Sequence, residues 1–239
     1  MNLTVVWYLI GAVGMAIGAA LASWRFVTDP PRRRYYAVLA LIPGIAAAAY
    51  AAMALGLGQV ATPNGQMLLP RYVDWLLTTP LLVLYLGLLC DPGRRVYVAL
   101  VVVDVVIIGS GVVAGLLPRP LGWVSFGVGS LAYVGLLYLL LSVLPRQAAL
   151  DHDRVDAVFT KLRNLTVVLW TLYPVVWVLS PLGLGLLQTS TEALVVTYLD
   201  LLSKVGFVII ALNGSDALRS LSTAAADASR TNEAGRTAD

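Results

Sequence analysis

The run TYLDLLSKVGFVIIALNG (residues 197–214) places a lysine in the middle of an apolar stretch, and Asp200 lies four residues before Lys204. A charged lysine near the centre of a bilayer costs about 3 kcal/mol on insertion scales, so such a residue normally has a function and a partner. Residues four apart lie on one face of a helix, which makes Asp200 the predicted partner. Two uses are common for such a lysine: an ion pair on a transport path, or a Schiff base with a carbonyl ligand.

The composition of the chain indicates an integral membrane protein. Of its 239 residues, 59% are hydrophobic and 12% are charged, and its mean hydropathy is +0.83. An ordinary soluble domain carries about a quarter charged residues, so that class is excluded. The net charge of +3 is divided among short connections, which argues against a nucleic-acid partner and leaves the lipid bilayer as the expected one.

Seven apolar stretches are long enough to cross a bilayer as helices. They cover residues 3–26, 34–57, 70–90, 95–115, 122–144, 155–179 and 190–217. Hydrocarbon offers backbone groups no partner outside the helix itself, so the predicted fold class is an all-α membrane protein, a bundle of seven transmembrane helices. This domain would span residues 1–218, and a polar cytoplasmic tail over 219–239 is expected to be disordered.

The basic residues predict the orientation of the chain in the cell membrane. Of the 16 Lys and Arg residues, all except Arg71, Arg119 and Lys204 fall on the side of the first, third and fifth connections and of the C-terminus. The positive-inside rule assigns that side to the cytoplasm, so the N-terminus is expected outside. No metal site is expected, because the single histidine, His152, has no companion at a metal-ligand spacing.

Few carboxylates remain inside the predicted spans. Asp74 has Arg71 three residues before it and Thr78 four after it, so one helical face presents a cation, a carboxylate and a hydroxyl. A plain ion pair that clamps two helices explains any one of the intramembrane charges, but a nearly neutral buried cluster explains all four: Asp74, Asp200, Arg71 and Lys204. Asp104 has no cation nearby in the sequence and is predicted to be a protonated, hydrogen-bonded structural carboxyl.

Aromatic residues recur at helical spacing on the sixth span, where Trp170, Tyr173 and Trp177 lie beside Pro174. Such residues usually form a core, and the small residues on the fourth and fifth spans usually serve close packing of helices. Together they also leave room for a flat, elongated hydrophobic ligand between tryptophans.

Three stretches resemble signatures of the haloarchaeal microbial (type 1) rhodopsins: RYVDWLLTTPLL (71–82), RNLTVVLWTLYPVVW (163–177) and LDLLSKVGF (199–207). The resemblance covers all seven spans and leaves out only the tail. It implies all-trans retinal on Lys204 through a protonated Schiff base, with Asp74 as counterion and proton acceptor and Asp200 as second counterion. Arg71 would link that pair to the outer side.

The resemblance also implies which side chains hold the retinal. They are Lys204, Tyr72, Trp75, Thr79, Leu82, Ile107, Gly111, Phe126, Gly129, Tyr133, Trp170, Tyr173, Pro174, Trp177 and Ser203.

Departures from the family pattern favour a sensor over a pump. Proton pumps of the family carry a carboxylic acid eleven residues after the Asp74 position, where this chain has Tyr85, so reprotonation from the cytoplasm should be slow. Chloride pumps lack the carboxylate at the Asp74 position and fit worse. Of the outer pair that releases protons, Glu192 matches one member, but Leu182 stands at the other.

Other positions resemble sensory rhodopsin II, also called phoborhodopsin. Ser203 replaces the usual alanine of pumps and is expected to hydrogen-bond Tyr173, which would couple isomerisation to a helix movement, and Phe126 replaces their tryptophan. Tyr198 is a candidate contact for a two-helix membrane transducer of the methyl-accepting type. The resemblance implies a blue-light photoreceptor for phototaxis and not an enzyme, and it leaves a homo-oligomer open.

Two other functions remain open from the sequence. One is a light-driven proton pump with a slow photocycle, which shares the Asp74 acceptor. The other is a seven-helix transporter or ligand receptor without retinal, in which Lys204 would act as an ion-pair partner.

Overall fold

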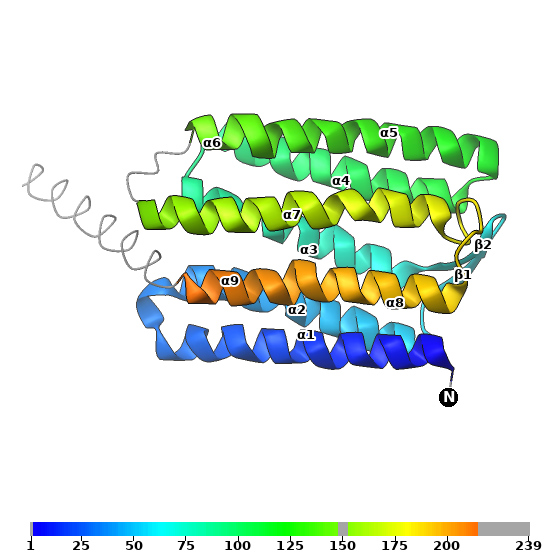
Figure 1. The fold of residues 1–239 in the computed structure, drawn as a ribbon, viewed down its shortest axis with the longest axis horizontal. Coiled ribbons are helices and arrows are strands. Elements are labelled where there is room, and N and C mark those ends of the chain that lie inside the picture. The colour runs from blue at the N-terminus through cyan, green and yellow to red at the C-terminus, as the bar shows by residue number, and fades with distance from the viewer. Residues whose placement is uncertain (1, 148–152, 215–239) are drawn as a thin grey trace, which may run out of the picture.

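The computed structural model describes residues 2–147 and 153–214. Its helices run lengthwise side by side, and a small hairpin lies at the end that carries the N-terminus (Figure 1). The elements in chain order are α1 (Leu3–Thr28), η1 (Pro30–Arg32), α2 (Arg33–Ala54), β1 (Gln59–Thr62), β2 (Gly65–Leu68), α3 (Leu69–Cys90), α4 (Arg94–Leu116), α5 (Arg119–Tyr138), η2 (Leu139–Val143), α6 (Leu144–Gln147), α7 (Asp153–Leu179), α8 (Thr189–Asp200), η3 (Leu201–Gly206) and α9 (Phe207–Asn213).

Within the described residues, seven helical stretches are long and apolar enough to cross a membrane, which confirms the predicted fold class. They are Leu3–Thr28, Pro30–Ala54, Leu69–Cys90, Arg94–Leu116, Arg119–Arg146, Val155–Leu179 and Thr189–Asn213. Large apolar side chains cover the outside of the bundle, for example Leu131 and Trp24, as expected for a surface that faces lipid. The predicted tail over 219–239 and His152 lie outside the described residues.

The second helix differs from its predicted range of 34–57 at both ends. It begins with the short 3₁₀ turn η1, because Pro30 suits a first helical position where no backbone N–H is needed. It ends at Ala54 because Gly56 and Gly58 have φ angles of 73° and 71°, a left-handed conformation that stops a helix. The last described helix of the seventh span ends at Asn213, and residues 215–217 of its predicted range lie outside the described residues.

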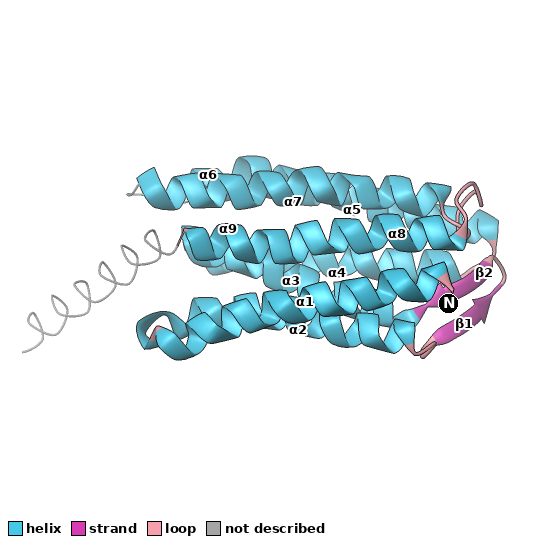
Figure 2. Cartoon of the chain, turned by 60° about the horizontal axis from the view of Figure 1, so that its bottom comes forward, coloured by secondary structure: helices cyan, strands magenta, loops and turns pink. Residues whose placement is uncertain are grey.

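A two-stranded hairpin, which the sequence analysis treated as a connection, joins α2 to α3. Its strands β1 and β2 are antiparallel, with Thr62 opposite Gly65 across the turn, and they cover one end of the bundle (Figure 2). The Asn64 side chain donates to the carbonyl oxygen of Leu117 at 2.6 Å. The hairpin is thereby fixed to the connection between α4 and α5, and we call this end of the molecule the hairpin end.

Two π-helical turns interrupt the fifth and seventh helices. η2 follows α5, and η3 separates α8 from α9. Such turns occur frequently at functional sites, and η3 contains both Ser203 and Lys204. The fold therefore presents the lysine from a locally widened turn of the seventh helix.

Candidate functional site

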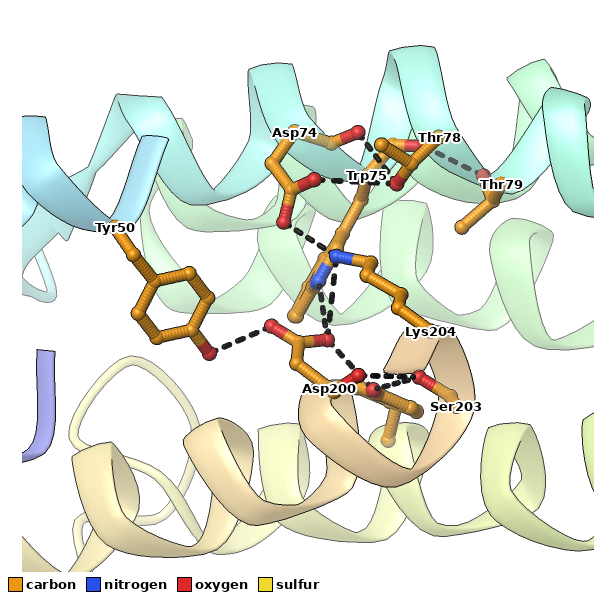
Figure 3. A network of polar contacts seen from close by, with 9 residues as sticks. Tyr50, Asp74, Trp75, Thr78, Thr79, Asp200, Ser203 and Lys204 are labelled. Atoms are coloured by element: carbon orange, nitrogen blue, oxygen red, sulfur yellow. Dashed lines mark hydrogen bonds and ion pairs between the residues drawn. The ribbon is translucent and has the colours of Figure 1, made fainter. Parts of the chain in front are cut away.

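Lys204 is buried in the bundle with two carboxylates beside its amine (Figure 3). Its Nζ atom lies 2.5 Å from Oδ2 of Asp74 and 3.6 Å from Oδ1 of Asp200. The spacing of Asp200 and Lys204 had predicted the second contact, and the geometry confirms it. Asp74 belongs to α3, so the shorter ion pair joins the third and seventh helices.

Three neutral donors surround the carboxylate of Asp200. The hydroxyl of Tyr173 and Nε1 of Trp75 donate to Oδ1 at 2.7 Å and 3.2 Å. The hydroxyl of Tyr50 donates to Oδ2 at 2.7 Å. Because hydrogen bonds to a carboxylate favour its charged form, this arrangement stabilises Asp200 as a fixed negative charge even without Lys204.

Asp74 receives much less support. The hydroxyl of Thr78 lies 3.2 Å from Oδ1 of Asp74 and 2.8 Å from its backbone carbonyl. A hydroxyl has a single hydrogen, and the carbonyl is the closer acceptor. The negative charge of Asp74, a fully buried residue, therefore depends mainly on Lys204.

Arg71 was predicted to belong to this group of charges, but it does not. Its guanidinium pairs with Oε1 of Glu192 at 2.6 Å, and within the described residues it forms no ion pair with Asp74 or Asp200. Arg71 precedes Asp74 by about one helical turn, so its side chain reaches the first turn of α8 at the hairpin end. The predicted cluster of four charges consists of three, with a separate Arg71–Glu192 pair beside it.

Asp104 forms a second polar contact, between α4 and α3. Oγ1 of Thr79 lies 2.6 Å from the carbonyl oxygen of Trp75 and 2.7 Å from Oδ2 of Asp104. The hydroxyl has one hydrogen, so Thr79 shares it between these two acceptors and donates from α3 to Oδ2 of Asp104 on α4. The hydrogen bond predicted for Asp104 is confirmed, and its protonated state stays a prediction.

A cavity next to Lys204 is lined by residues of α3, α4, α5, α7, α8 and η3. All fifteen residues that the resemblance assigns to retinal line it, so the structure brings the whole predicted set together. Four residues outside that set also line it: Asp200, which was predicted as the second counterion, and Asp104, Ile108 and Ser130. Asp104, Ile108 and Gly111 share one helical face, because they are four and three residues apart. Their spacing from Gly111 could therefore have predicted that Asp104 and Ile108 line the cavity.

Aromatic rings form much of the cavity wall. Phe126 stacks on Trp177 with ring centroids 4.5 Å apart, and Trp75 meets Tyr173 edge to face at 5.2 Å. Nε1 of Trp177 is buried and has no hydrogen-bond partner among the described residues. A flat apolar ligand suits the space between such rings, and the amine of Lys204 offers it a point of covalent attachment.

Comparison with known proteins assigns the family. The family model described as bacteriorhodopsin-like protein matches residues 2–218. The chain belongs to the bacteriorhodopsin-like family. It is a multi-pass membrane protein with seven spanning helices.

Relatives in this family include sensory proteins. The sensory rhodopsin-2 of Halobacterium salinarum is 48% identical over 227 residues, which are 95% of this chain and 95% of that protein. The sensory rhodopsin-2 of Natronomonas pharaonis is 38% identical over 213 residues, 89% of each chain. The crystal structure of a thermophilic rhodopsin from Rubrobacter xylanophilus has a TM-score of 0.88 and 37% identity, and covers 92% of this chain and 99% of that one.

Four of the residues that the resemblance associates with a sensor or a pump lie in the described part of the chain: Tyr173, Ser203, Tyr198 and Tyr85. The hydroxyls of Tyr173 and Ser203 lie 3.2 Å apart, which confirms the predicted hydrogen bond. Tyr198 on α8 is 62% exposed on the outside of the bundle. Tyr85 is fully buried, and its ring packs edge to face against Tyr35 and Phe207.

Proposed function

We propose that this bacteriorhodopsin-like protein is a blue-light photoreceptor for phototaxis that carries all-trans retinal on Lys204. The observation that carries the proposal is the position of Nζ, which borders an aromatic cavity and lies 2.5 Å from Asp74. Retinal, when bound to that nitrogen as a protonated Schiff base, supplies the light-absorbing group and the change from the all-trans to the 13-cis isomer.

The hydrogen bonds support Asp74 as the proton acceptor. Asp200 would have to give up favourable contacts from three donors to become neutral. Asp74 would lose only its pairing with Nζ and a weak contact with Thr78. Transfer of a proton from Nζ to Oδ2 of Asp74 is therefore the smaller change, and Asp200 stays charged as the second counterion.

Neutralising this pair would weaken the connection between α3 and the seventh helix. Before the transfer, Asp74 and Lys204 hold α3 and η3 together by opposite charges in a buried setting. After it, both groups are neutral and this attraction is lost. A bundle with two alternative packings would then shift toward the one in which the end opposite the hairpin is open.

The surroundings of Tyr85 support a sensor over a pump. Asp74 is the sole acidic residue of α3, and the ring of Tyr85 lies in an apolar and aromatic cluster. No carboxyl group stands there to return a proton to Nζ, so the open state should be long-lived. A long-lived state gives a signalling partner time to respond.

Two features support a membrane transducer as that partner. Tyr198 presents an exposed aromatic ring on α8, and two relatives are named sensory rhodopsin-2. The hydrogen bond between Tyr173 and Ser203 connects α7 to η3 beside the cavity. A change at Lys204 can thus reach α7, and a two-helix transducer packed near Tyr198 would detect the movement.

Flash photolysis tests the proposal. The protein is expressed with all-trans retinal in membranes that lack a transducer, and recovery of the visible band is followed. We expect recovery over a large fraction of a second or longer. Recovery in about ten milliseconds with a proton released on the outer side would instead indicate a pump. Acid-denatured protein without an adduct on Lys204 would favour a transporter or receptor without retinal.

One substitution tests the assigned cause of slow recovery. Tyr85→Asp places a carboxyl group where proton pumps have one and should shorten recovery of the dark state. Tyr85→Phe is the matched control, because the Tyr85 hydroxyl has no hydrogen-bond partner among the described residues. Equal recovery times in the Asp and Phe variants would contradict the argument from the missing donor.

A further inference from the structure

A hydrogen bond joins α5 to α7 in the wall of the cavity, away from the charged residues around Lys204. The hydroxyl of Tyr133 on α5 lies 2.8 Å from Oγ1 of Thr171 on α7. Tyr133 lines the cavity and is 8% exposed, whereas Thr171 is on the exposed side of α7. Tyr133 therefore extends from the cavity to the seam between the two helices.

The direction of this bond follows from the number of hydrogens available. Oγ1 of Thr171 donates to the carbonyl oxygen of Val167 at 2.7 Å. A hydroxyl has one hydrogen, so Thr171 has none left for Tyr133 and must accept from it. The hydroxyl of Tyr133 also lies 3.3 Å from the same Val167 carbonyl. A single side chain of α5 is thus bound to one turn of α7.

That turn lies just before a weak point of α7. Pro174 has no backbone N–H, so the carbonyl of Trp170 loses its regular helical partner. Prolines and back-bonded threonines are both common causes of helix bending. Thr171 lies three residues before Pro174, so the bond from Tyr133 restrains α7 next to the position where it bends most easily.

We propose that the Tyr133–Thr171 hydrogen bond is a clasp that holds α7 against the cavity wall. Tyr133 is then a positioning residue: it lies beside the bound cofactor and determines how readily α7 moves away from α5. This role in the light response rests on the proposed function, whereas the clasp itself is a property of the protein alone. Breaking the clasp should favour the state in which α7 has moved outward.

The first experiment measures the distance between α5 and α7 in protein that carries no cofactor. Spin labels are attached at Leu141 and Lys161, which are exposed near the same end of the bundle, in a Cys90→Ala background. Pulsed electron paramagnetic resonance then gives the distribution of distances between the labels. We expect longer or broader distances in Tyr133→Phe and in Thr171→Val, and no further change in the double variant, because either substitution removes the same bond.

Two control variants remove similar groups without touching the clasp. Tyr85→Phe deletes a buried hydroxyl that has no hydrogen-bond partner in the described part of the chain. Thr166→Val deletes the bond from Thr166 to the Leu162 carbonyl within α7 at 2.9 Å. Both should leave the distances unchanged. Unaltered distances in Tyr133→Phe and Thr171→Val, or equal changes in the controls, would overturn the clasp.

The second experiment uses protein loaded with all-trans retinal. A hydrogen bond between neutral groups corresponds to a change of about two- to tenfold in an equilibrium. Recovery after a flash should therefore slow by roughly that factor in Tyr133→Phe and Thr171→Val. Altered distances with unchanged recovery would overturn the positioning role. If the protein fails to bind retinal, the proposed function fails, but the label distances still decide whether the clasp exists.

Discussion

At the scale of single residues, the two carboxylates beside Lys204 differ in the donors they receive. Asp200 accepts three hydrogen bonds from neutral side chains, whereas Asp74 depends mainly on the lysine. Because the negative charge of Asp74 depends on Lys204, Asp74 can take up a proton when the lysine nitrogen changes. This asymmetry divides the roles into a fixed charge and a proton acceptor, although both are aspartates at the same buried site.

Asp74→Asn should move the absorption of the retinal-loaded pigment to longer wavelength. The substitution removes the negative charge nearest to Nζ, and with it the stabilisation of the positive charge at that nitrogen in the dark state. Visible spectra of purified protein measure the shift. Asp104→Asn is the matched control, because Asp104 forms no ion pair with Nζ among the described residues and the amide oxygen of asparagine can still accept from Thr79. An unchanged spectrum in Asp74→Asn would show that Asp74 is not the counterion.

Asp104→Leu should lower stability more than Asp104→Asn does. The leucine removes the buried hydrogen bond between Thr79 and Asp104, and one hydrogen bond contributes about 1 kcal/mol. Thermal unfolding in detergent compares the two variants. Equal stability would show that the hydrogen bond between Thr79 and Asp104 does not stabilise the protein.

The sequence predicts the site well where the chemistry is local. Asp200 and Lys204 follow from a spacing of four residues, and Asp74 follows from its motif. Tyr50 could not be predicted in this way. It donates to Asp200 from 150 positions away, and a single tyrosine on an apolar helix carries no signal of its partner. Arg71 likewise has its partner, Glu192, on a distant helix.

At the scale of elements, the packing of α1 against α2 supports the site. A Cβ atom at Gly11 would lie 2.3 Å from the ring of Tyr50, and that ring is buried and bound to Asp200. The helix pair therefore requires glycine at this position. The hydrogen bond from Tyr50 to Asp200 depends on this glycine as well.

Gly11→Ala should destabilise the protein by about 1–3 kcal/mol, which is typical of overpacking. Gly44→Ala on α2 is the control, because its Cβ would meet only Ala19 at 3.9 Å. Since alanine favours helix over glycine, that variant should be neutral or more stable by up to about 1 kcal/mol. Thermal unfolding measures both. A stable Gly11→Ala protein would show that Tyr50 can move without cost.

Elements that the bilayer dictates could be predicted, and the others could not. The seven spans follow from length and hydropathy, because hydrocarbon enforces long helices. The hairpin of β1 and β2 depends on the contact between Asn64 and the connection after α4. The π-helical turn at Leu201–Gly206 leaves no trace in the pattern of apolar residues either.

At the scale of the whole molecule, the two ends of the bundle differ in charge. Arginines lie at the end opposite the hairpin, on the termini of several helices: Arg25, Arg33, Arg34, Arg94, Arg95 and Arg146. The hairpin end has Arg119 and the Arg71–Glu192 pair. The positive-inside rule therefore predicts that the hairpin end lies outside the cell.

Labelling of single cysteines in intact cells tests this orientation. Gln66→Cys lies on β2 at the hairpin end, and Gly93→Cys lies between α3 and α4, where a Cβ meets nothing within 4 Å. About 33 Å of helix separates them, so one reagent cannot reach both from one side. In a Cys90→Ala background, a membrane-impermeant maleimide should label Gln66→Cys in intact cells and Gly93→Cys only after lysis. The reverse result would mean that the hairpin end faces the cytoplasm. Any release of protons and the proposed opening would then each occur on the side of the membrane opposite to the predicted one.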